Sequence, residues 1–147
     1  MFAKKIKYTN FAGEAREEEF LFHMSKADVV KWQYSINGGI DELFKRVINT
    51  NDQTALIQLV TDIIHRAYGE KSIDGKRFEK RRDGHDLADD FEQTSAYDVL
   101  FMELITDEKA AAEFINGIMP PELVSQANAL PKLPDGSIDL NAVTAKG

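Results

Sequence analysis

An apolar pattern of helical period between Gln53 and Tyr68 constrains the fold of this chain more than any other feature. Six apolar residues recur there at intervals of three and four, which places them on one face of a helix. Such a helix must pack this face against other elements, so the pattern predicts a helical body. We expect Asn51 or Asp52 to cap the helix and Gly69 to end it as the C′ residue. The six residues are Leu56, Leu59, Val60, Ile63, Ile64 and Ala67.

Further helices are expected on both sides of this one. Ser25 and Asp28 form a variant capping box, which predicts a helix that stops at Asn37–Gly38–Gly39. Pro120–Pro121 ends the last long helical pattern, because proline cannot continue a helix. The other expected helices run from Asp41 to Ile48, from Asp86 to Gln93, from Thr94 or Ser95 through Ile105, from Asp107 through Ile118, and over 122–129.

Residues 3–24 predict a β-hairpin instead. Ile6 and Tyr8 alternate with lysines, Asn10–Gly13 supplies turn residues, and Phe20 and Phe22 share one face of the returning strand. The first strand is rich in lysine and the second in glutamate, so opposite charges can face each other across the pair. Each such pair is worth only a few tenths of a kcal/mol, but it helps to set the register. The charged residues are Lys5, Lys7, Glu17, Glu18 and Glu19.

These elements predict an α+β fold that is mainly α. A single globular domain covers 1–130, with the hairpin at 3–24 and about five to six short helices over 25–130. A chain of 147 residues suits one domain. From Pro131 onward the chain has turn residues and little apolar material, so we expect a flexible tail over 131–147.

Charge and composition exclude several classes of protein. The formal net charge of −7 disfavours nucleic-acid binding, which depends on Lys and Arg neutralising phosphates. The chain has no cysteine, so it has neither disulfides nor thiolate metal sites. No apolar run approaches the ~20 residues that span a bilayer, and the first residues lack the apolar region of a signal peptide. We expect a soluble, intracellular protein without a membrane partner.

One basic segment, residues 70–83, is the best argument for nucleic-acid binding. Its six basic and four acidic residues leave a net charge of +2, and only Phe78 offers an aromatic ring. We therefore expect a solvated charged loop, turning at Asp74–Gly75, that could also dock an acidic protein surface. The basic residues are Lys71, Lys76, Arg77, Lys80, Arg81 and Arg82.

Neither a catalytic nor a cofactor residue is indicated. The serines lie in cap, turn or tail contexts, and none sits in a nucleophile elbow. The three histidines are far apart in sequence, and only His85 has neighbours that suit a cation: Asp86, Asp89 and Asp90. We assign no metal there, because acidic residues are expected in the first turn of a helix. The sequence predicts a protein without enzymatic activity.

The apolar residues of the C-terminal half admit two interpretations. Tyr97, Leu100, Phe101 and Leu104 occupy one helical face, and Phe114 and Ile118 occupy another. Each face could be core, or part of a groove for an apolar partner helix. Methionine suits a surface that accepts varied apolar sequence. The candidate partner-binding residues are Tyr97, Phe101, Met102, Phe114, Ile118 and Met119.

The order of residues between Lys71 and Leu123 also carries a family resemblance. It consists of Gly75–Phe78, Phe91, Thr94, Ala96–Tyr97, Leu100–Phe101, Glu103–Leu104, Thr106–Asp107 and Phe114–Ile118 before Pro120. This ordered set resembles the C-terminal half of the tail assembly chaperones of long-tailed bacteriophages. The hairpin and the Ser-capped helix fit the same family more weakly.

The resemblance implies a non-enzymatic binding protein that needs no cofactor. Such chaperones hold the tape-measure protein soluble and bring it to the tail-tube protein in the host cytoplasm, and they are absent from the finished virion. This chain would be the short product, made beside a longer form by programmed ribosomal frameshifting, and it could form a homo-oligomer. Two alternatives stay open: a minor structural component of the tail, and a regulatory nucleic-acid binder that uses residues 71–82.

Overall fold

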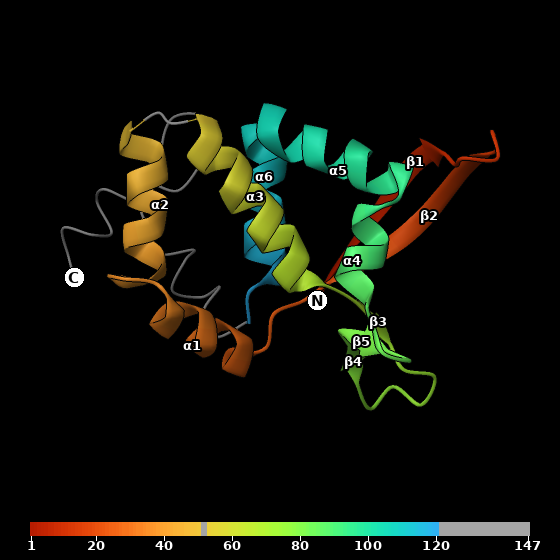
Figure 1. Ribbon diagram of the computed structural model, residues 1–147, viewed down its shortest axis with the longest axis horizontal. Helices are drawn as coiled ribbons and strands as arrows, with labels where there is room; N and C mark the ends of the chain where they lie inside the picture. Colours follow the sequence, from red (N-terminus) through yellow and green to blue (C-terminus); the bar gives the residue numbers. More distant parts are fainter. Residues whose placement is uncertain (51–52, 121–147) are drawn as a thin grey trace.

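The computed structural model describes residues 1–50 and 53–120, and it confirms the α+β, mainly α fold (Figure 1). An N-terminal hairpin, β1 (Phe2–Thr9) and β2 (Ala15–Phe22), precedes the helical body. The predicted caps at Asn51 or Asp52, the helix over 122–129 and the tail over 131–147 lie outside the described residues.

The predicted hairpin is confirmed, and its two strands pair along their whole length. Lys5 faces Glu19 and Lys7 faces Glu17, with Lys7 Nζ 3.6 Å from Glu17 Oε2. The Asn10 side chain closes the turn by accepting from the backbone amide of Glu14 at 2.9 Å. The expected pairing of opposite charges across the two strands is therefore confirmed for Lys7 and Glu17.

The sheet is larger than the sequence predicted. It has four strands in the order β1-β2-β3-β4, with β3 at Tyr68–Lys71 and β4 at Phe78–Glu79. A separate pair, β5 (Arg81–Arg82) and β6 (His85–Asp86), follows. The turn at Asp74–Gly75 is confirmed, since it connects β3 and β4.

The expected role of Gly69 is wrong. The helix over 53–67 ends at Ala67, and Gly69 pairs with Leu21 inside the sheet instead of ending the helix. A Cβ on Gly69 would lie 2.6 Å from both the Phe78 ring and the Glu79 carbonyl oxygen. Glycine is thus required there because β4 approaches the backbone closely.

Six helices lie in the described residues, and their caps are mostly those predicted. Ser25 and Asp28 form the capping box, and Asp86, Thr94 and Asp107 cap three later helices. The second helix begins at Gly39, earlier than expected, where the Gln33 side chain accepts from the Ile40 amide at 2.9 Å. The helices are α1 (Lys26–Ser35), α2 (Gly39–Thr50), α3 (Gln53–Ala67), α4 (Leu87–Glu92), α5 (Ser95–Thr106) and α6 (Glu108–Ile118).

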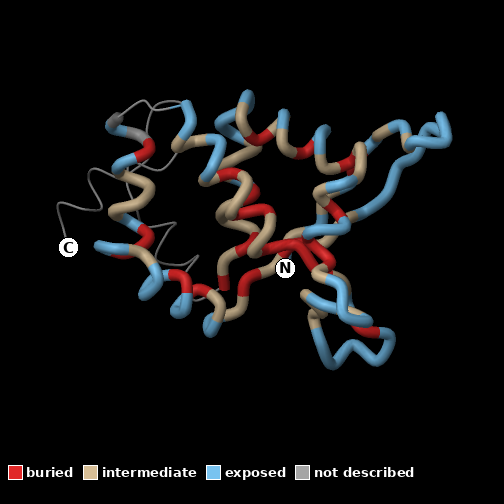
Figure 2. The backbone as a smooth tube through the Cα atoms, viewed as in Figure 1, coloured by how far each residue is buried: buried red, intermediate tan, exposed pale blue. Residues whose placement is uncertain are grey.

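Aromatic rings form the centre of the core. Phe22 of β2 contacts Tyr68, Phe91 and Phe114, with ring centroids 5.7, 5.9 and 5.0 Å away. Tyr68 and Phe91 stack at 4.3 Å. Buried positions accordingly gather where the base of the hairpin meets α3, α4 and α6 (Figure 2). This core joins the hairpin to the helices and decides which helical faces remain exposed.

Candidate functional site

The two α6 residues predicted to bind a partner are part of the core. Phe114 is 2% exposed and Ile118 1% exposed. The Phe114 ring meets those of Phe2 and Phe22 edge-on, at 5.6 and 5.0 Å. Neither Phe114 nor Ile118 can contact a partner in this structure, so they act as packing residues that fix α6 beneath the hairpin.

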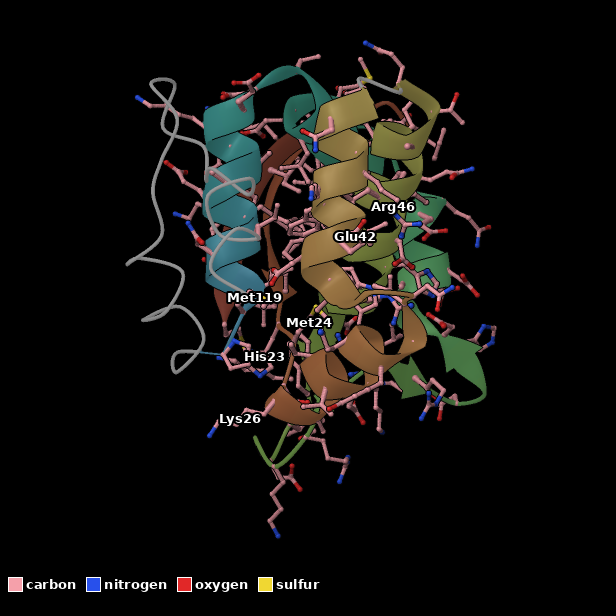
Figure 3. All side chains as sticks on the ribbon, turned by 90° about the vertical axis from the view of Figure 1, so that its left-hand side faces the viewer. His23, Met24, Lys26, Glu42, Arg46 and Met119 are labelled. Atoms are coloured by element: carbon pink, nitrogen blue, oxygen red, sulfur yellow. The ribbon has the colours of Figure 1, made fainter. Side chains whose placement is uncertain are left out.

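Met119 lies just beyond the last turn of α6 and is half-buried. Figure 3 shows Met119 near Met24, and Met24 belongs to the segment that joins β2 to α1. The Met24 amide donates to the Ile118 carbonyl at 2.8 Å, which ties this segment to the end of α6. Met119 is therefore packed against the core while part of its surface remains accessible.

The α5 candidates differ from those of α6. Tyr97 and Phe101 are half-buried and stack on each other at 5.8 Å, and Tyr97 also meets Phe91 at 5.7 Å. Burial raises the pKa of the Tyr97 hydroxyl, which lies beside Thr61 of α3. Met102, by contrast, is 54% exposed. Of the six candidates, Met102 is the most accessible.

One side of α5 remains uncovered, and we name it the α5 face: Asp98, Val99, Met102 and Thr106, all exposed. Val99 is 41% exposed and was missed as a candidate. Its spacing of three residues from Met102 is the signal that could have revealed it. The α5 face thus combines two adjacent apolar side chains with a carboxylate.

The charged segment 70–83 is more ordered than a solvated loop, so that expectation is wrong for two of its residues. Lys80 Nζ donates to the carbonyls of His23 at 3.0 Å and Arg66 at 2.6 Å, and burial lowers its pKa to about 8. Arg82 donates to Glu70 and Glu79. Both cations have internal partners and are not free to bind phosphate.

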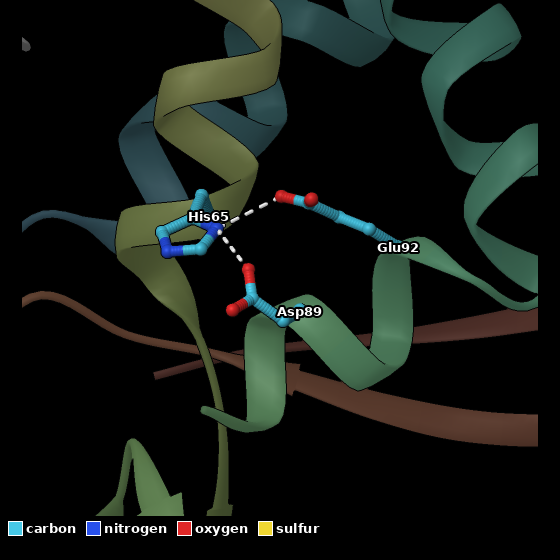
Figure 4. A group of neighbouring side chains, drawn as sticks. All are labelled: His65, Asp89 and Glu92. Atoms are coloured by element: carbon cyan, nitrogen blue, oxygen red, sulfur yellow. Dashed lines mark hydrogen bonds and ion pairs between the residues drawn. The ribbon is translucent and has the colours of Figure 1, made fainter. Parts of the chain in front are cut away.

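The acidic residues around α4 face a different histidine from the one predicted. Among the described residues, His85 forms an ion pair with Asp90 alone, at 4.0 Å. His65 of α3 instead contacts Glu92 at 2.8 Å and Asp89 at 3.7 Å (Figure 4). It also lies 3.4 Å from Asp86. Burial acts to lower the pKa of His65, but the hydrogen bond to Glu92 and the three carboxylates outweigh it and raise that pKa.

Ligand atoms of His65, Asp89 and Glu92 lie within 4.8 Å of one another, a spacing that could admit a divalent cation. The hydrogen bond and ion pairs to a protonated imidazole already account for this approach. We therefore interpret the group as a charged contact between α3 and α4 and assign no metal to it.

A cavity of about 210 Å³ opens beside this contact. Arg66 lies in its wall, donates a hydrogen bond to Asp62 at 2.8 Å and lies over the Trp32 ring at 5.5 Å. Lys80, also in the wall, donates hydrogen bonds to two backbone carbonyls. These groups stabilise the joint between α1, α3 and the strands. The charged lining residues are Asp28, Lys31, His65, Arg66, Lys80 and Asp86.

Comparison with known proteins identifies the family of the chain. A family model described as phage tail assembly chaperone matches residues 1–143. No curated protein and no solved structure matches the chain significantly. Across residues 1–50 and 53–120, the model contains no helix of the length and apolar character needed to cross a membrane.

Proposed function

The chain belongs to the phage tail assembly chaperone family, and from this membership we propose that it binds the tape-measure protein and keeps it soluble while the tail is built. The role is that of a non-enzymatic binding protein. It acts in the host cytoplasm and leaves before the virion is complete. The family assignment supports the general role, and the exposed surface of α5 supports the way in which the chain would perform it.

The observation that carries this proposal is the α5 face. Val99 and Met102 expose apolar surface side by side on a helix whose opposite side is firmly packed through Leu100 and Leu104. A helix or an extended apolar segment of another protein can cover such a surface. Met102 is well suited to this contact because its flexible thioether adapts to different apolar neighbours.

Weak binding by each copy is sufficient for this role. A tape-measure protein is long and offers many apolar segments, so several chaperone copies along one chain gain affinity through high effective concentration. We also propose the tail-tube protein and a longer, frameshifted product as further partners, and self-association between neighbouring copies.

Co-expression tests the proposal directly. The full chain is produced together with the tape-measure protein of the same phage, and the soluble fraction of the tape-measure protein is measured by quantitative immunoblotting. We expect a clear increase over expression of the tape-measure protein alone, and retention of the chaperone in a pull-down. An unchanged soluble fraction without retention would refute the proposal.

Mass spectrometry of purified virions separates this role from that of a minor tail component. We expect peptides of the tape-measure and tail-tube proteins but none of this chain. Detection of the chain at a fixed copy number per virion would instead support a structural role.

A further inference from the structure

The surface that includes α4 and α5 has an unusual charge pattern. Between Asp86 and Asp107 the sequence contains seven acidic residues and neither lysine nor arginine. This stretch covers both helices, so neither α4 nor α5 carries a lysine or an arginine. The acidic residues are Asp86, Asp89, Asp90, Glu92, Asp98, Glu103 and Asp107.

Most of these carboxylates already have a structural role. Glu103 accepts from Lys4 Nζ of β1 at 2.7 Å, and Asp107 caps α6 by accepting from the amides of Lys109 and Ala110. The acidic residues near α4 face His65, apart from Asp90, which faces His85. These contacts explain their positions without any partner protein.

Asp98 lies in the first turn of α5, where a carboxylate is favourable, but its side chain has no such contact among the described residues. It is exposed, and no residue within 1–50 or 53–120 forms an ion pair with it. It lies on the α5 face together with Val99 and Met102, whose apolar side chains are 41% and 54% exposed. An unpaired carboxylate beside exposed apolar side chains matches a partner that offers both apolar groups and a cation.

We propose that the α5 face binds an amphipathic helix that carries lysine or arginine beside its apolar residues, with Asp98 receiving the cation. This inference rests on the proposed function and deepens it by naming the chemistry of the tape-measure segment that is recognised. The apolar residues of that segment cover Val99 and Met102. The unpaired Asp98 attracts basic helices and repels acidic ones, which gives selectivity among apolar segments.

Two synthetic helical peptides test the inference. They share the same apolar positions, and the flanking positions hold lysine in one and glutamate in the other. Binding of each labelled peptide to the full chain is measured by fluorescence anisotropy at low and high salt. We expect the lysine peptide to bind at least about tenfold more tightly at low salt. The difference should shrink as salt screens the charges.

Two matched variants then test whether Asp98 is the residue that favours the lysine peptide. Asp98→Asn keeps the size of the side chain and should weaken binding of the lysine peptide about two- to fivefold, the range of a single exposed ion pair. Glu113→Gln removes an equal charge from an exposed position on α6 and should leave binding unchanged. Circular dichroism confirms that both variants remain folded.

The inference is overturned if the two peptides bind equally, if neither binds, or if Asp98→Asn behaves like Glu113→Gln. Its failure can be told apart from failure of the proposed function. If the co-expressed tape-measure protein is still kept soluble, the chaperone role stands and only the charge-selective recognition is lost. If solubility is not maintained either, both conclusions fall.

Discussion

Helices α5 and α6 have similar apolar spacing, yet only α5 leaves large apolar side chains exposed. The hairpin contacts both helices: Phe2 and Phe22 lie against Phe114 of α6, and Lys4 forms an ion pair with Glu103 of α5. On α5 the residues toward the core, such as Leu100, are equally buried, but Val99 and Met102 remain exposed. Periodicity therefore identifies apolar positions, whereas the packing of the surrounding elements decides which of them are core and which remain available surface.

The strongest test of this difference is Phe114→Ala. Truncating this buried ring should destabilise the protein by about 3–5 kcal/mol, because a cavity remains beside Phe22. Chemical denaturation measures the loss, and Phe101→Ala on α5 is the matched control. Since Phe101 is only half-buried, its loss should be clearly smaller. Equal losses would show that α5 is packed as fully as α6.

Gly117 offers a second test of how tightly α6 is held. A Cβ at this position would lie 2.5 Å from Cδ2 of the Phe2 ring. Gly117→Ala should therefore destabilise by about 1–3 kcal/mol through overpacking. In an exposed helix the same change would stabilise by about 0.5–1 kcal/mol.

A double-mutant cycle isolates this contact. In a Phe2→Ala background the ring atoms are gone and only the 3.0 Å approach to Cβ of residue 2 remains, so Gly117→Ala should cost clearly less. If the cost of Gly117→Ala is the same in both backgrounds, the hairpin does not press on α6 as the structure shows.

The region around α4 and α5 depends on charge as well as on packing, so it should respond to pH. The folded-state pKa of His65 is raised, hence the protonated form stabilises the fold below its unfolded pKa, and this contribution is lost as pH rises through the folded value. His65→Gln should cost roughly 0.5 kcal/mol at mildly acidic pH, since the side chain is partly exposed, and almost nothing at pH 9.

Thermal melts of the wild type and of His65→Gln across this pH range measure the difference. His85→Gln is the control, because its imidazole is 70% exposed and 4.0 Å from Asp90. A constant gap between His65→Gln and the wild type at all pH values would contradict the ion-pair interpretation. The aromatic packing of α6 contains no titrating group, so the Phe114→Ala loss should vary little over the same range.

Local signals in the sequence predicted much of this fold. The capping residues Ser25, Thr94 and Asp107 were identified correctly, because a cap depends on hydrogen bonds within a few residues. The hairpin followed from the alternation of apolar and charged residues on both sides of a turn. Each of these features is determined by neighbours in the chain.

Contacts between segments that are far apart in the sequence could not be predicted from these local signals. The strand at Tyr68–Lys71 exists because it pairs with β2, where Leu21 lies opposite Gly69, and nothing in its four residues indicates a strand. Likewise, His65 meets the carboxylates of α4 only because α3 packs beside that helix. The buried state of Phe114 depended on the position of Phe2, more than a hundred residues earlier.

The smallest expected effect on stability separates surface from core most directly. Met102→Ser should change the free energy of unfolding by no more than about 0.5 kcal/mol, because the side chain is largely exposed. It should nevertheless reduce the soluble fraction of co-expressed tape-measure protein. Val30→Ser on α1, at the same 54% exposure, should leave that fraction unchanged. A loss of solubility in both variants would show that exposed apolar surface in general, rather than the α5 face, holds the partner.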